Sequence, residues 1–181
     1  MPRTGALAAA ALCVLLLGGC SGGGGGDVVH VGKTALTQKQ LDAVVAHFRT
    51  VAKAEGQPFP AAGTGAFRQL RNRLLGLLVY REELKQAAER LGVKVDQDEL
   101  TRRLAASKGG ESESAAGDTS AHDSVVAQLL YEGIFQKVTR NAHGSTPAEA
   151  AAARNAAMAS FIARFERETK VRYEPGYAPG S

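Results

Sequence analysis

The apolar residues of five segments recur every three or four positions, which is the spacing of one face of an α-helix. These segments cover residues 37–55, 67–91, 96–104, 121–141 and 146–165. The second segment has the broadest stripe, formed mainly by leucines, and at 1.5 Å per residue its helix would be roughly 38 Å long. The pattern predicts a mainly α-helical domain of about five helices.

Residues with helix-capping preferences lie at the ends of these segments. Thr37, Asp96 and Thr146 are each followed three residues later by glutamine or glutamate, the spacing of a capping box. Pro147 follows Thr146 at the first helical position, where a missing N–H is tolerated. Gly92 comes directly after the second segment, where a left-handed C-cap is expected. The capping residues therefore support the helix boundaries that the apolar pattern predicts.

Two short β-branched runs, residues 28–31 and 171–173, predict strands on either side of the helical region. Residues 107–120 are rich in glycine, serine and glutamate, and they offer little apolar surface to bury. We therefore expect a mobile loop at 107–120 within a single domain spanning 27–173. A flexible tail is expected at 174–181.

The N-terminal residues have a different character from the rest of the chain. Arg3 provides a short cationic start, and residues 6–17 form an unbroken run of twelve apolar residues. This run is too short to cross a bilayer, which needs about 20 apolar residues, but it suits the central region of a secretory signal. Two glycines then precede Cys20. One interpretation is an ordinary signal peptide followed by a chance cysteine.

The small residues before Cys20 also resemble the bacterial lipobox, and we favour this interpretation because the position, the apolar run and the flanking residues agree. The resemblance implies cleavage after residues 1–19, a lipid on Cys20 through a diacylglyceryl thioether, and an acylated N-terminus. Glycine-rich residues 20–26 would then be a flexible tether. The protein would be exported and anchored by lipid to the outer face of the cytoplasmic membrane, or to the outer membrane in a two-membrane cell.

Composition limits the classes of partner. The chain has 22 basic and 18 acidic residues, and removal of residues 1–19 would leave 162 residues with a formal charge of +3. This small, dispersed excess argues against a nucleic-acid partner. Arg68, Arg71 and Arg73 could favour an anionic lipid or an acidic substrate, but we interpret them as the solvated face of a helix. Cys13 would leave with the signal, so the body would have no cysteine for a disulfide.

The sequence contains no recognisable set of catalytic or metal-binding residues. His30, His47, His122 and His143 lack the spacing of a metal site. The glycine-rich stretches lack the lysine and hydroxyl residue of a phosphate loop, and neighbouring carboxylates lie in polar segments unsuited to acid catalysis. We therefore predict no catalytic residue, no metal and no cofactor, and we do not expect an enzyme.

Several segments, taken in order, resemble the N-terminal domain of SurA/PrsA-type foldases, a family of exported chaperones and foldase lipoproteins. They are residues 28–37 followed by Leu41, then 74–84, 87–95 and 96–100. The resemblance implies a helical domain with a minor pair of short strands formed by its two ends. It also implies a chaperone or foldase that binds unfolded or newly secreted polypeptides without ATP.

Many members of this family carry a parvulin-type peptidyl-prolyl isomerase domain. Only about 40 residues follow the fourth predicted helix, too few for a typical domain. We therefore expect the isomerase domain to be absent. Two alternatives to a chaperone stay open: a non-catalytic scaffold lipoprotein that binds one specific partner, and an isomerase by family label only.

Crossing helices with wide leucine stripes can leave an apolar groove for an extended client segment. The candidate peptide-binding residues are Leu74 and Leu78 in the second helix and Leu129 and Phe135 in the fourth. All four residues also suit a packed core.

Overall fold

Five helices and three short strands form the part of the chain that the computed structural model describes, residues 26–107 and 115–179. In chain order they are β1 (Asp27–Val31), β2 (Thr34–Thr37), α1 (Gln38–Ala54), α2 (Gly65–Leu91), α3 (Gln97–Ser107), α4 (Ala115–Thr139), α5 (Pro147–Glu168) and β3 (Val171–Tyr173). The predicted mainly α-helical architecture is confirmed. Among these described residues, no helix is long and apolar enough to span a membrane.

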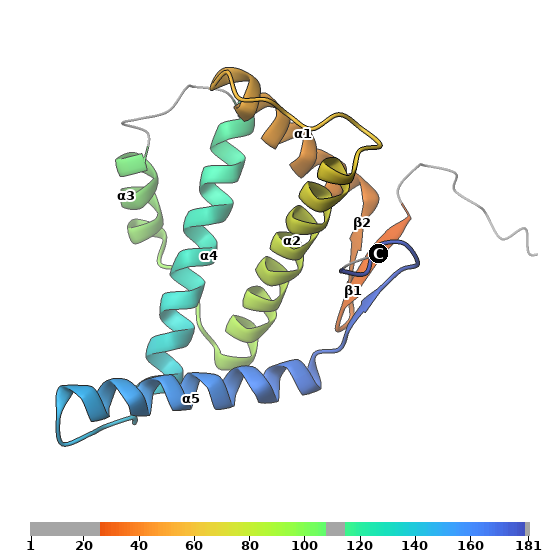
Figure 1. Ribbon diagram of the computed structural model, residues 1–181. Coiled ribbons are helices and arrows are strands. Elements are labelled where there is room, and N and C mark those ends of the chain that lie inside the picture. Colours follow the sequence, from red (N-terminus) through yellow and green to blue (C-terminus); the bar gives the residue numbers. More distant parts are fainter. Residues whose placement is uncertain (1–25, 108–114, 180–181) are drawn as a thin grey trace, which may run out of the picture.

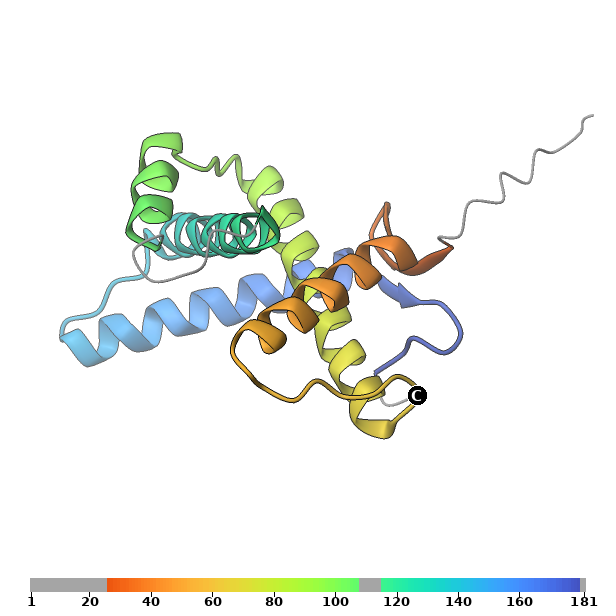
Figure 2. The same cartoon turned by 90° about the horizontal axis from the view of Figure 1, so that it is seen from above.

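Helix α2 is the central element, because both apolar cores form along it. Its first half packs against α1 and the sheet, and its second half packs against α4 and α5. In Figure 1, α2 and α4 lie side by side, with α1 across one end of the pair and α5 across the other. Figure 2 shows from above that α5 continues well beyond α4. The first core contains Val28, Val29, Val31, Leu36, Leu41, Val45, Leu74, Leu75 and Val79, and the second contains Leu84, Ala87, Ala88, Leu130, Ile134, Met158 and Phe165.

The sheet joins the two ends of the domain. Strand β1 lies between β2 and β3, and both pairings are antiparallel. Val29 pairs with Tyr173 and Val31 with Val171, which confirms the predicted pairing of the chain ends. Strand β2 was not predicted. The sheet therefore has three strands rather than the expected two. The four residues of β2 carry little strand signal of their own, and the hairpin is completed by Gly32, whose φ of 58° suits a tight turn.

The helix ends follow the capping residues. Thr37 and Thr146 each form a complete capping box, and Pro147 is the first residue of α5. The side-chain oxygen of Asp96 accepts hydrogen bonds from the backbone N–H groups of residues 98 and 99 at the start of α3. Gly92 ends α2 with a φ of 65°, in the left-handed region. These local signals were therefore sufficient to place most helix boundaries.

Helix α4 begins six residues earlier than the apolar pattern indicated. The pattern predicted a start at residue 121, whereas the backbone is helical from Ala115. An established helix extends readily because each added residue gains a hydrogen bond without a new nucleation step, and alanine favours that extension. Part of the predicted 107–120 loop is therefore helical, and residues 108–114 lie outside the described residues.

The C-terminal tail packs against the body of the domain, whereas the sequence predicted a flexible segment from Glu174. The backbone N–H of Glu174 donates to the carbonyl oxygen of Val28 at 3.0 Å. The hydroxyl of Tyr177 donates to Oε1 of Gln38 at 2.5 Å, and Arg71 lies over the Tyr177 ring, 5.1 Å from its centroid. Residues 174–177 therefore help to fix the sheet end of α2. The predicted signal peptide and most of the tether lie outside the described residues.

Candidate functional site

Three neighbouring cavities lie along α2, each sharing lining residues with the next, and together they make up a depression in the surface. The first lies between β2, α1 and α2, the second between α2 and α4, and the third between α2, α4 and α5. Leu77 and Arg81 line both the first and the second, while Tyr80 and Tyr131 line both the second and the third. We call this depression the α2 trough. Its main lining residues are Val44, Phe48, Leu77, Leu78, Tyr80, Arg81, Leu84, Tyr131, Ile134, Met158, Phe161, Ile162 and Phe165.

The most exposed large apolar side chains of the described residues all line the α2 trough. Phe48 is 37% exposed, Tyr80 46%, Tyr131 41% and Ile162 42%. They come from α1, α2, α4 and α5, so they are far apart in the sequence. A soluble surface rarely gathers its exposed apolar residues in one place unless that place binds something. The trough is therefore the strongest candidate for a binding site.

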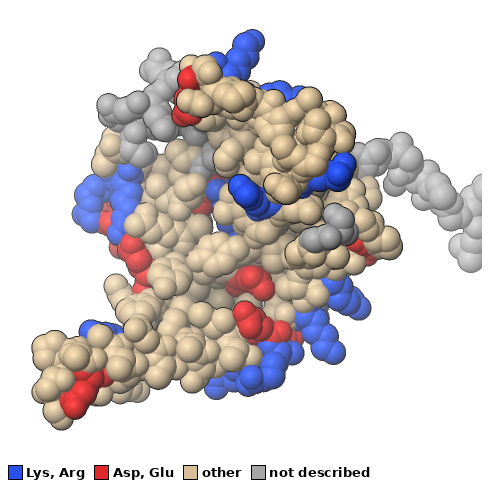
Figure 3. Space-filling view, viewed as in Figure 1, with Lys and Arg blue, Asp and Glu red and all other residues tan. Residues whose placement is uncertain are grey.

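The helical repeat explains how α2 lines most of the trough. Leu77, Tyr80, Arg81 and Leu84 are three or four residues apart and share one face of the helix. From the opposite side, Tyr131 of α4 reaches the same space, with its ring stacked against Phe135 at 6.4 Å between centroids. In Figure 3 the face between α4 and α2 is hollowed and mostly uncharged, with acidic groups gathered just above α5.

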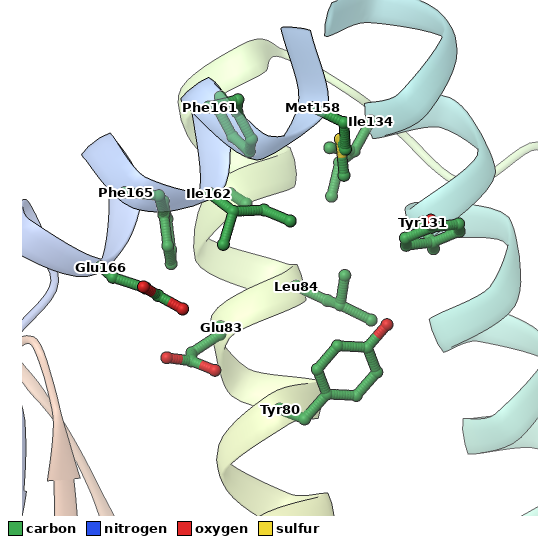
Figure 4. Close-up of a pocket in the computed structure, with 11 residues that line it drawn as sticks. Tyr80, Glu83, Leu84, Tyr131, Ile134, Met158, Phe161, Ile162, Phe165 and Glu166 are labelled. Carbon is green, nitrogen blue, oxygen red and sulfur yellow. The ribbon is translucent and has the colours of Figure 1, made fainter. Parts of the chain in front are cut away.

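The α5 end of the trough is a cavity of about 150 Å³. Phe161, Ile162 and Phe165 project into it from α5 (Figure 4). Arg90 lies over the ring of Phe165, 4.7 Å from the centroid, and donates to the hydroxyl of Thr169 at 2.9 Å. These contacts tie the end of α5 to α2. Because α5 is held in this way, its aromatic residues form a fixed wall.

Two carboxylates, Glu83 of α2 and Glu166 of α5, lie at one side of this cavity, and Tyr80 and Tyr131 lie at the other (Figure 4). Burial raises the pKa of Glu83, and the negative charge of Glu166 raises it further. Burial also raises the pKa of Tyr80, with smaller contributions from Tyr131 and Glu83. The two carboxylates therefore give this end of the trough a negative electrostatic potential.

The four predicted peptide-binding residues occupy different environments. Leu74 is only 4% exposed and belongs to the first core. Leu78 is half-buried and lines the trough beside α1. Leu129 and Phe135 are half-buried on α4, and Phe135 packs against the second core. Leu78 is thus the one member of this set that lines the trough.

Sequence reasoning chose candidates on α2 and α4, which both line the trough, but it did not select Phe48, Tyr80, Tyr131 or Ile162, and it chose no residue of α1 or α5. The two tyrosines beside the leucine stripes were one available signal. A fully buried tyrosine needs a hydrogen-bond partner for its hydroxyl, so tyrosine is favoured where an apolar surface meets solvent. Cys20, the predicted lipidation site, lies outside the described residues. Within the described ranges, no group of three or more histidine, cysteine or acidic residues is arranged to hold a metal ion.

Comparison with known families adds one finding. A family model described as the SurA-like N-terminal domain matches residues 4–130. The match begins in the apolar N-terminal segment, covers β1 to α3 and ends at Leu130 within α4. Helix α5 and strand β3 lie beyond it. No curated protein matches the chain.

Proposed function

This chain belongs to the SurA-like N-terminal domain family, and from this premise we propose that it is an ATP-independent chaperone that binds unfolded or newly secreted polypeptides in the α2 trough. The family indicates a chaperone-like role in general terms. The tethering to a membrane through a lipid on Cys20 is part of our proposal and follows from the lipobox-like sequence before that residue.

A single observation carries the proposal: among the described residues, the four exposed large apolar side chains all line the α2 trough. A protein whose only requirement was a stable core would gain by covering Tyr80, Tyr131 and Ile162, because apolar burial contributes about 25 cal/mol per Å². An extended client segment could cover them instead by laying its own apolar side chains along α2.

The shape of the trough fits weak and general binding. It is partly open to solvent, and its walls come from four separate helices. An extended chain advances about 3.3 Å per residue, so a short segment would contact several of these walls at once. Such contacts release quickly because they bury little area, and release then needs no nucleotide.

The proposed tether would let the domain sample the space above a membrane. A glycine-rich linker of the length of residues 20–26 has an r.m.s. reach of about 15 Å. Clients leaving the membrane would then meet the trough at a high local concentration.

The test is suppression of aggregation. An unfolded client is diluted from denaturant in the presence of a stoichiometric amount of the purified full-length chain, and light scattering is followed. We expect suppression by the natural chain and a marked loss with Ile162→Ser. The matched control is Ala163→Ser, which introduces the same residue at the next, exposed position of α5 outside the trough.

No suppression by the natural chain for any of several unrelated clients would reject the proposal. Equal suppression by both variants would show that the trough is not the binding surface. Tight binding of one folded protein without binding of unfolded clients would indicate a scaffold lipoprotein.

A further inference from the structure

The charges along the α2 trough are balanced at the α1 end and unbalanced at the α5 end. Beside α1, Arg81 pairs with Asp123 at 3.3 Å and Lys85 pairs with Glu82 at 3.9 Å. Beside α5, the charged lining residues are Glu83 and Glu166. Within the described part of the chain, no lysine or arginine forms an ion pair with either of these two carboxylates.

The two carboxylates face the same apolar space from different helices. Glu83 projects from α2 and Glu166 from α5, and both lie beside Phe165 and Ile162 at the edge of the cavity (Figure 4). Glu83 is half-buried, while Glu166 is exposed. A cation placed between them would therefore be partly shielded from water, where charge-assisted hydrogen bonds are stronger than at an open surface.

Tyr80 and Tyr131 give the other side of the cavity a surface suited to the same occupant. Each presents an exposed aromatic ring, and Tyr80 lies on α2 three residues before Glu83. The aliphatic stem of a lysine or arginine can cover such rings while its charged end reaches the carboxylates. A neighbouring apolar client residue would contact Ile162 and Phe161.

We infer that the α5 end of the trough selects client segments in which a lysine or arginine adjoins an apolar or aromatic stretch. This inference rests on the proposed function and specifies its substrate class. Charge complementarity carries it: an apolar cavity bordered by two carboxylates without cationic partners favours a cationic apolar segment over a neutral or acidic one.

Three short fluorescent peptides test the selection. They share one apolar, aromatic core and differ only in the flanking residue, which is lysine, glutamine or glutamate. Their affinities for the full-length chain are measured by fluorescence anisotropy. We expect the lysine peptide to bind about tenfold more tightly than the glutamate peptide, with the glutamine peptide between them. High salt should reduce this ratio, because screening weakens exposed charge interactions.

The double variant Glu83→Gln/Glu166→Gln is expected to bring the lysine-to-glutamate affinity ratio to within about twofold of one. The matched control, Glu55→Gln/Glu89→Gln, changes the net charge equally at exposed positions that do not line the trough. It should keep the natural ratio.

The outcomes separate this inference from the proposed function. If all three peptides bind equally, the charge selection is wrong and the chaperone proposal stands. If the control variant lowers the ratio as much as the double variant, net charge rather than the Glu83–Glu166 pair is responsible, and the inference is overturned. If none of the peptides binds, both proposals fail.

Discussion

Val93 packs directly against the backbone of Gly133, so the segment after α2 and the C-terminal part of α4 approach more closely than a side chain at residue 133 would permit. A Cβ atom at this glycine would lie 2.6 Å from Cγ1 of Val93. Val93 is β-branched and stiff at χ1, so it has little freedom to move aside. The close approach of this segment to α4 therefore requires glycine at residue 133.

Gly133→Ala is therefore expected to destabilise the protein, although alanine favours helices over glycine. The helical gain is about 1 kcal/mol, and overpacking costs about 1–3 kcal/mol, which leaves a net loss of about 1 kcal/mol. Gly76→Ala in α2 is the matched control because a Cβ there meets nothing within 4 Å. It should raise stability by about 0.5–1 kcal/mol. Urea denaturation of both variants measures the difference, and equal stabilisation would contradict the packing argument.

Substitutions at Leu74 and Tyr80 should distinguish the residues that stabilise the fold from those that bind peptide. Leu74→Ala opens a cavity in the first core and should lower the free energy of unfolding by about 2–5 kcal/mol. Tyr80→Gln removes a side chain that is 46% exposed, so its effect on stability should stay within about 0.5 kcal/mol. Peptide affinity should fall for Tyr80→Gln and be retained by the folded fraction of Leu74→Ala. The reverse result would place the binding surface elsewhere.

The raised pKa of Glu83 predicts a pH-dependent contribution to stability. The folded state binds the proton more tightly than the unfolded state, so stability falls as the pH rises from the ordinary pKa of a glutamate through the raised pKa of Glu83. Glu83→Gln removes the ionised form and should therefore stabilise the protein at pH 7. The gain should disappear below pH 4.5. Thermal unfolding across this range measures it, with Glu89→Gln as the control for net charge.

The capping box at the start of α5 supplies a fourth prediction. The hydroxyl of Thr146 accepts a hydrogen bond from the backbone N–H of Glu149 at 3.2 Å, and Oε2 of Glu149 accepts one from the N–H of Thr146 at 3.0 Å. Thr146→Ala should cost about 1 kcal/mol. Ser145→Ala should have little effect, because Ser145 contributes its backbone N–H to Glu149. Similar losses in both variants would contradict the capping argument.

Much of the fold could be predicted because its signals are local. The capping boxes, Gly92 and the apolar spacing lie within a few residues of the elements they define, and the helices formed where those signals indicated. Strand β2 was not predicted because its hydrogen bonds are made with β1, and its own four residues do not specify that pairing. The early start of α4 was not predicted because the extension of a helix depends on the helix already formed rather than on an apolar stripe.

The sequence by itself determined the helical segments and most of their ends, and its family resemblance indicated the pairing of the terminal strands. The tertiary structure decided which apolar residues of those helices stay uncovered. Leu74 and Tyr80 both lie on α2, yet Leu74 is buried against the sheet and α1, while Tyr80 faces the space between α2 and α4. Periodicity assigns a residue to a face of its helix, whereas its exposure depends on how closely the neighbouring helices approach, which residues far apart in the sequence decide together.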